Sequence, residues 1–163
     1  MSRIEELEKQ AKAILEEIEK LKKEGNKKVS KVWKPECDED YYVIETDGEV
    51  RVYTWYDDAR DEEYYTIGNC FKTKEEAEKA VEKAKIYTQL KRLAEENNTE
   101  PIDWNNGGQI KFRISYDWDD GALFQENNHS IQNQCAIYCT NRDYLKIAIE
   151  RIGEENLLKL FKE

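Results

Sequence analysis

The stretch Tyr41-Tyr42-Val43-Ile44-Glu45-Thr46-Asp47-Gly48-Glu49-Val50-Arg51-Val52-Tyr53-Thr54-Trp55-Tyr56 decides how the first half of this chain folds. Its two halves, 41–46 and 49–56, are rich in β-branched and aromatic residues, which favour extended strands. Asp47-Gly48 stands between them, and this pair is typical of a tight hairpin turn. The sequence therefore predicts an antiparallel hairpin at this point.

The chain after the hairpin is predicted to add a third strand and then a helix. The run Asp57-Asp58-Ala59-Arg60-Asp61-Glu62-Glu63 is typical of a solvated loop, and Tyr64–Ile67 is predicted to be a short strand. Thr73 followed by Glu76 forms a capping box, which predicts a helix that runs to about Asn97. Residues 32–98 are therefore predicted to form a first, acidic module in the order β-β-β-α.

The same order recurs over residues 99–163. Apolar and polar residues alternate from Ile110 to Trp118, as in a half-buried strand, and Asp120-Gly121 then turns the chain. A third strand is predicted at Gln134–Cys139, followed by a helix that Thr140 and Asp143 cap and that Gly153 breaks. Three antiparallel strands with one polar face need a helix to cover the other face. The predicted fold class is α+β, with an N-terminal coiled-coil-like helix followed by two β-β-β-α modules with antiparallel sheets.

The N-terminal segment, residues 1–25, is predicted to be an amphipathic helix. Ser2 and Glu5 form a capping box at its start, and Gly25 suits its end. Apolar residues recur at alternating spacings of three and four, which is the seam of a parallel coiled coil. We therefore expect a homodimer, although a helix packed on its own globular body fits the same pattern. The predicted oligomerisation residues are Ile4, Leu7, Ala11, Ile14, Ile18 and Leu21.

Composition excludes several classes of protein. The chain has 163 residues, 26 Lys and Arg against 36 Asp and Glu, and a formal net charge of −10. Its 4 Trp, 10 Tyr and 4 Phe are too many for a disordered chain. No apolar run reaches the roughly 20 residues of a membrane span, and residues 1–24 are too charged for a signal peptide. We expect a cytoplasmic protein with no membrane association, and its acidity does not favour direct DNA binding.

The negative charge is concentrated in one segment of the chain. Residues 35–71 carry 2 basic and 12 acidic side chains, which equals the net charge of the whole chain. Such a block is either a solvated loop that keeps the protein soluble or a surface for a basic partner. Exposed Tyr and Trp side chains beside it would anchor such an interface. The predicted partner-binding residues are Asp57, Asp58, Asp61, Glu62, Glu63, Trp55 and Tyr56.

Residue patterns that carry catalysis are missing from the sequence. His129 is the single histidine, and the cysteines Cys37, Cys70, Cys135 and Cys139 contain no C-x-x-C pair. There is no nucleophile elbow, P-loop, zinc-protease or dinucleotide-binding pattern. We expect a protein that is not an enzyme and that uses no cofactor and no metal.

Three strings of the sequence are similar to a known group of proteins. They are Trp33-Lys34-Pro35, Asp47-Gly48-Glu49-Val50 and Ile67-Gly68-Asn69-Cys70-Phe71-Lys72-Thr73-Lys74-Glu75-Glu76-Ala77-Glu78. The chain resembles small uncharacterised proteins encoded by phages and prophages of Firmicutes. That resemblance implies an accessory phage gene, and such genes often encode small, acidic, non-enzymatic inhibitors of host defence, including anti-CRISPR proteins.

The expected function follows from the acidic segment together with this resemblance. We expect a binding protein that inhibits a host or defence protein, of the CRISPR type or another nucleic-acid-binding protein, by occupying its basic cleft. Two other functions fit the sequence. One is a sponge for a nucleotide or signalling ligand, and the other is a structural assembly protein held through the coiled coil.

Overall fold

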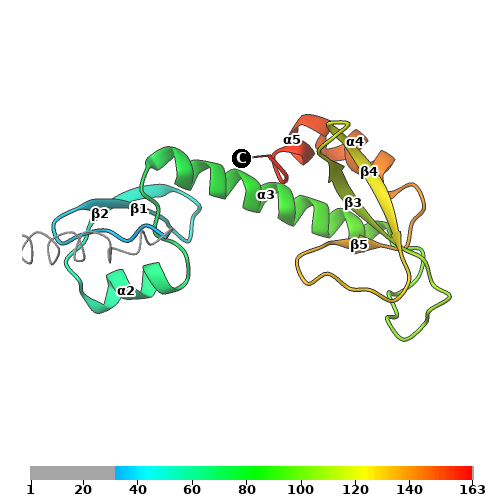
Figure 1. The fold of residues 1–163 in the computed structure, drawn as a ribbon, viewed down its shortest axis with the longest axis horizontal. Helices are drawn as coiled ribbons and strands as arrows, with labels where there is room; N and C mark the ends of the chain where they lie inside the picture. The colour runs from blue at the N-terminus through cyan, green and yellow to red at the C-terminus, as the bar shows by residue number, and fades with distance from the viewer. Residues whose placement is uncertain (1–31, 163) are drawn as a thin grey trace, which may run out of the picture.

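Residues 32–162 are described by the computed structural model, and they form two lobes that one long helix joins (Figure 1). The first lobe contains β1, β2, α2 and the start of α3, and the second contains the end of α3 and everything after it. The predicted N-terminal helix and its six apolar residues lie outside the described residues. The elements are β1 (Asp40–Ile44), β2 (Val50–Thr54), α2 (Ala59–Thr66), α3 (Lys74–Asn97), β3 (Lys111–Asp117), β4 (Ala122–Asn128), β5 (Tyr138–Cys139), α4 (Tyr144–Ile152) and α5 (Glu154–Leu158).

The first hairpin is confirmed. β1 and β2 pair antiparallel with Tyr42 opposite Val52, and Gly48 takes the left-handed conformation (φ 82°) that the turn requires. The core of this lobe is small and aromatic, because Tyr41, Val43 and Trp55 are its buried members. The Tyr41 and Trp55 rings meet edge to face with centroids 5.6 Å apart, a favourable arrangement for aromatic pairs.

The predictions of a solvated loop over residues 57–63 and of a strand at Tyr64–Ile67 are both wrong. The chain forms the helix α2 over most of this segment. Asp58 caps this helix by accepting hydrogen bonds from the backbone N–H groups of Arg60 and Asp61. Asp61 accepts in return from the backbone N–H of Asp58. Acidic side chains at a helix start are stabilised by the helix dipole, so the acidic run favours this helix. The first lobe therefore lacks the predicted third strand, and Phe71 makes only a single bridge to Tyr42 on β1.

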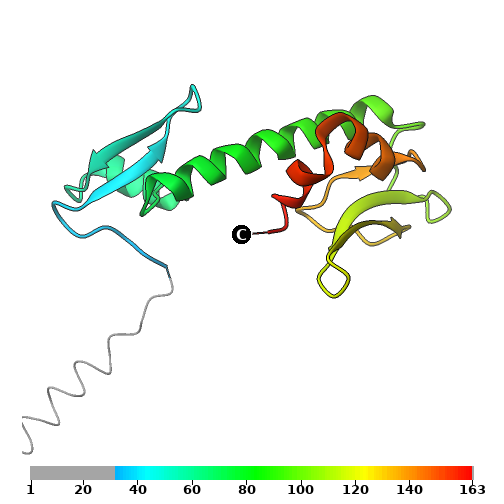
Figure 2. The same cartoon turned by 90° about the horizontal axis from the view of Figure 1, so that it is seen from above.

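Helix α3 begins at Lys74 and ends at Asn97, and its predicted capping box between Thr73 and Glu76 is present. Its start packs on β1 and β2, and its end packs on α4 and β5 (Figures 1 and 2). The middle of the helix bridges the two lobes, which explains why its polar residues are spread around it. Ala84 and Tyr87, which lie in this middle part of the helix, are both exposed.

The second lobe contains the predicted β-β-β-α order. Its sheet has the strand order β4-β3-β5 with antiparallel pairs, and Gly121 (φ 68°) turns the β3–β4 hairpin. Gly153 (φ 90°) separates α4 from α5 as expected. β5 is only two residues long, so residues 134–137 of the predicted strand are irregular. The core residues are Leu90, Leu93, Ala94, Phe112, Cys139, Tyr144, Ala148 and Leu157.

Thr140 does not cap α4 as the sequence suggested. Its hydroxyl accepts the backbone N–H of Thr99 at 2.9 Å and donates to the carbonyl of Glu100 at 3.1 Å. Its own backbone N–H donates to the side chain of Asn98. Thr140 thus ties the end of α3 to the sheet. Asp143 precedes α4 without any capping hydrogen bond from its side chain.

The described helices include none that combines the length and the apolar character needed to cross a membrane.

Candidate functional site

The seven residues predicted to bind a partner differ in their exposure to solvent. Tyr56 is 64% exposed, and Asp57, Asp58 and Glu63 are also exposed. Trp55 and Asp61 are only 2% and 4% exposed. These two residues therefore belong to the interior of the first lobe, and their assignment to the binding surface is corrected. The remaining residue, Glu62, is half-buried.

Asp61 is held inside the lobe by three hydrogen bonds. The Tyr41 hydroxyl donates to Oδ1 at 2.7 Å, while the backbone N–H groups of Tyr56 and Asp58 donate to Oδ2 at 2.7 and 3.3 Å. Burial by itself raises the pKa of the Asp61 carboxyl, but these donors outweigh burial and hold the pKa below its ordinary value. Burial and the bond to Asp61 raise the pKa of Tyr41. The charged carboxylate is thus part of the core.

The lowered pKa of Asp61 predicts a specific acid sensitivity. The ionised group is stabilised in the folded state relative to the unfolded state. An unperturbed aspartate has a pKa of about 3.9. The contribution of Asp61 to stability is therefore complete above about pH 4 and is lost as the pH falls through the lower folded-state pKa. We expect Asp61→Asn to flatten the fall of unfolding free energy below about pH 4, measured by urea titration at several pH values. An unchanged pH profile in this variant would contradict the assignment.

Lys34 packs against the aromatic core of the first lobe from its solvent side. Its ammonium lies 5.0 Å from the ring centroid of Trp55 and 5.2 Å from that of Tyr65. It also donates to Glu62 at 2.5 Å, and this bond raises the pKa of Lys34. Glu62 is therefore already paired within the lobe and is less available to a partner than its exposed neighbours.

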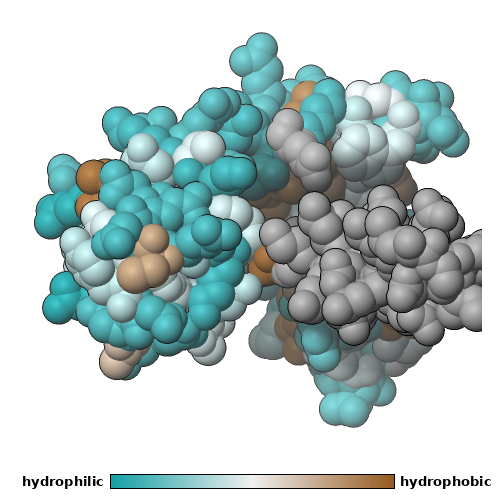
Figure 3. Space-filling model, turned by 60° about the vertical axis from the view of Figure 1, so that its left-hand side comes forward, coloured by the Kyte–Doolittle hydropathy of each residue, from teal (hydrophilic) through white to brown (hydrophobic). Residues whose placement is uncertain are grey.

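The acidic face is defined here as Tyr56, Asp57, Asp58 and Glu63. The backbone N–H of Tyr56 is bonded to buried Asp61, so the core fixes the main chain under an exposed aromatic ring. Asp57 has a left-handed backbone (φ 59°), which aspartate tolerates better than most residues. The lobe that comes forward in Figure 3 is mainly hydrophilic, with only scattered apolar spots. The structure therefore presents acidic groups and one aromatic ring on a rigid support.

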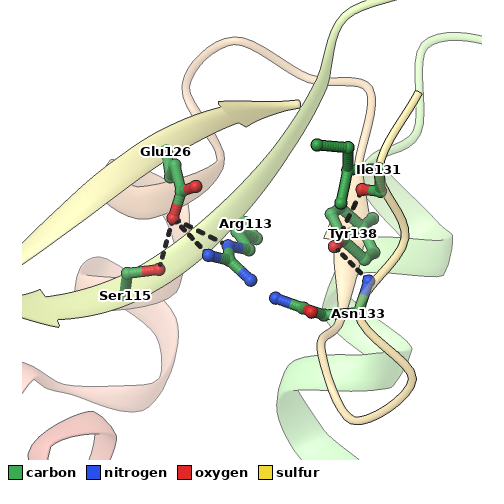
Figure 4. Close-up of polar contacts among 6 residues, drawn as sticks. All are labelled: Arg113, Ser115, Glu126, Ile131, Asn133 and Tyr138. Carbon is green, nitrogen blue, oxygen red and sulfur yellow. Dashed lines mark hydrogen bonds and ion pairs between the residues drawn. The ribbon is translucent and has the colours of Figure 1, made fainter. Parts of the chain in front are cut away.

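A second candidate site is a groove in the second lobe that the sequence did not reveal. It has a volume of about 900 Å³ and lies between β3, the end of α3, the segment 132–137 and the C-terminal residues. Arg113 and Glu126 from neighbouring strands form an ion pair on one side, and Ser115 also bonds Glu126 (Figure 4). The bond from Arg113 lowers the pKa of Glu126 against the opposing effect of burial. The only sequence signal was the polar half of the β3 alternation.

The far side of the groove is held in place by Tyr138. Its hydroxyl accepts the backbone N–H of Asn133 at 2.9 Å and donates to the carbonyl of Ile131 at 3.4 Å (Figure 4). The Tyr138 ring also packs edge to face on Trp104, with centroids 4.9 Å apart. These contacts fix the position of the segment 131–137, which forms the wall of the groove opposite β3.

Lys111 departs most from its expected environment. The strand alternation places it on the polar side of β3, yet its side chain is fully buried. Its ammonium donates to the backbone carbonyls of Asn106, Gln109 and His129 at 3.1, 3.1 and 2.9 Å. It also lies 5.2 Å from the centroid of the Trp104 ring. Lys111 therefore joins two loops to the sheet and is a structural cation.

Within residues 32–162, His, Cys, Asp and Glu side chains form no group of three or more that could hold a metal ion. The side chain of His129 is exposed. No protein-family model, curated protein or solved structure matches this chain.

Proposed function

We propose that this chain is a non-enzymatic binding protein whose acidic face occupies the basic, nucleic-acid-binding surface of a partner. The observation that carries the proposal is the exposure of Asp57, Asp58 and Glu63 beside the 64% exposed ring of Tyr56. In the setting that the sequence resemblance implies, the partner is a host or defence protein that binds nucleic acid.

Charge and rigidity both support this function. The segment 35–71 carries 12 acidic and 2 basic side chains, so the first lobe attracts a positively charged surface from a distance. The main chain around Tyr56 is already fixed by Asp61, so little conformational entropy is lost when a partner binds. A tyrosine among carboxylates is a suitable anchor for a cleft lined with Lys and Arg.

The test is capture from a Firmicutes host lysate with the whole chain as bait. We expect the captured protein to bind nucleic acid, and we expect added DNA to compete with the bait for it. Binding should weaken steeply as salt is raised from about 0.05 to about 0.3 M, because screening shortens the reach of surface charges. Capture that is insensitive to both salt and DNA would contradict the proposal.

Neutralising the acidic face is expected to weaken that binding roughly tenfold. The triple variant Asp57→Asn, Asp58→Ser, Glu63→Gln removes three exposed charges, each worth about 0.2–1 kcal/mol in an ion pair. Serine preserves the helix cap at position 58 and asparagine tolerates the left-handed backbone at position 57. Titration calorimetry with the captured partner measures the change.

A matched control removes the same number of charges elsewhere. Glu95, Glu96 and Glu150 are exposed residues of α3 and α4, away from the acidic face. Their triple replacement by glutamine changes the net charge equally and should leave the affinity within about twofold. If both triple variants lose affinity equally, net charge alone drives binding and the acidic face has no special role.

A further inference from the structure

The sheet of the second lobe has one strand edge that is only half covered. β5 pairs with β3 at Phe112 and Arg113 alone, whereas β3 continues to Asp117. From Ile114 to Asp117, β3 is paired with β4 on one side, and no described strand pairs with its other side. An uncovered strand edge presents backbone N–H and C=O groups that can pair with another extended chain.

The groove lies along this free edge. Ile114, Ser115 and Tyr116 contribute to its lining, and the segment 132–137 stands opposite them where a continued β5 would have run. The contacts of Tyr138 with Asn133 and Ile131 hold that segment in place (Figure 4). The space beside the edge is thus bounded on both sides, and its volume of about 900 Å³ is in the range of ligand-binding sites.

The lining of the groove has an apolar side and a polar side. The apolar side faces the helices and includes Leu90, Ile137, Leu160 and Phe161. The more polar side carries Arg113, Ser115 and Glu126 on the outer face of the sheet, where Phe124 opposite Ser115 is the one apolar member. The carboxamides of Gln132, Asn133 and Gln134 line the opposite wall. Successive side chains of a strand point to opposite sides, so a strand in this groove would place apolar and polar residues alternately.

Arg113 offers a free hydrogen-bond donor on the polar side of the groove. Arg113 is the only cation and Glu126 the only acidic residue among the described residues that line the groove, and the two form an ion pair in which the Arg113 side chain stays 20% exposed. Its Nε and Nη2 bond Glu126, while its third nitrogen points away from Glu126 in the view of Figure 4. That nitrogen can donate to one further acceptor, for which a carboxylate is the best match.

We infer that this groove binds an extended peptide of a partner protein, which adds a strand to the free edge of β3. The peptide carries alternating apolar side chains and one acidic side chain that Arg113 receives. Backbone hydrogen bonds to β3 supply affinity, and the contacts of alternate peptide side chains with the two sides of the groove supply specificity, as in other cases of strand addition. This site is independent of the acidic face, which lies on the other lobe.

The test uses a random peptide library, selected on the full chain and counter-selected on the variant Ala136→Trp. The tryptophan fills the groove at a residue that lines it. We expect selected peptides with alternating apolar residues, an Asp or Glu at a polar position, and at least about tenfold weaker binding to Ala136→Trp. Replacing that acidic residue by its amide should cost about two- to fivefold. The control Ala84→Trp adds the same side chain at an exposed site on α3 outside the groove and should bind as the wild type does.

Two measurements on the unaltered groove complete the test. Peptide binding should slow hydrogen exchange of the backbone amides between Ile114 and Asp117. In a Cys37→Ser background it should also protect exposed Cys135, which lines the groove, from alkylation. Selection of no groove-dependent peptide, or binding without slower exchange at this edge, would overturn the inference. A wild-type dimer that becomes monomeric with Ala136→Trp would also overturn it, because a second copy would then cover the edge.

Discussion

Replacing Asp61 with alanine is expected to lower the free energy of unfolding of the first lobe by about 3–5 kcal/mol. The change removes a buried acceptor from the Tyr41 hydroxyl and from two backbone N–H groups, and it leaves the Tyr41 hydroxyl buried without its partner. It also removes half of the capping box of α2. Because the core of this lobe contains few residues, no other contact replaces the loss.

The measurement is hydrogen exchange combined with urea unfolding. The two lobes have separate cores, so we expect protection to be lost in β1 and β2 while β3 and β4 keep theirs. Asp61→Asn should cost less, about 1–2 kcal/mol, because the amide oxygen can accept the backbone donors and its nitrogen can donate to Tyr41. The exposed Glu63→Ala should change stability by less than about 0.5 kcal/mol. A loss below about 1 kcal/mol for Asp61→Ala would show that the buried carboxylate is not a support of the fold.

Replacing Lys111 with alanine is expected to destabilise the second lobe by about 3 kcal/mol. The buried ammonium satisfies three backbone carbonyls, and its removal leaves them without a donor in a place where burial limits access to water. The aliphatic stem is also lost, which leaves a cavity beside the Trp104 ring.

Methionine at position 111 separates these two effects. Lys111→Met keeps most of the apolar stem and removes the charge, so the part of the loss that remains belongs to the carbonyl contacts. We expect at least half of the alanine effect, about 1.5–2 kcal/mol, to persist in urea titrations. The exposed Lys146→Ala on α4 serves as the control and should stay within about 0.5 kcal/mol of the wild type. Equal stability of Lys111→Met and the wild type would show that the ammonium contributes nothing net.

The sequence correctly predicted those turns and helix ends that depend only on neighbouring residues. The Asp47-Gly48 and Asp120-Gly121 turns, the Thr73 capping box and the break at Gly153 all appear where expected. Each depends on residues a few positions apart, so its free energy does not require the rest of the fold. The same reasoning failed at α2, because its capping box uses Asp58 and Asp61 instead of the commoner Thr and Glu pair.

The candidate sites depended on contacts between distant residues. Asp61 looked like one more surface carboxylate, and only the approach of Tyr41 from 20 residues away makes it a core residue. Lys111 looked like the polar half of a strand, and its three acceptors come from two different loops. The groove combines residues of α3, β3, β4 and the C-terminal segment, so no stretch of sequence could have indicated it.

The sequence by itself determined a chain with two small antiparallel sheets, a long helix between them and an excess of negative charge in the first half. Alternation, turn residues and helix caps act over a few residues, and charge is additive, so these features can be predicted without coordinates. The tertiary structure decided which of the charged side chains are buried and that the shortness of β5 leaves part of β3 uncovered. Burial and strand pairing arise from packing between segments that are far apart in the chain. That packing therefore decides which acidic side chains remain exposed on the acidic face and where the groove forms.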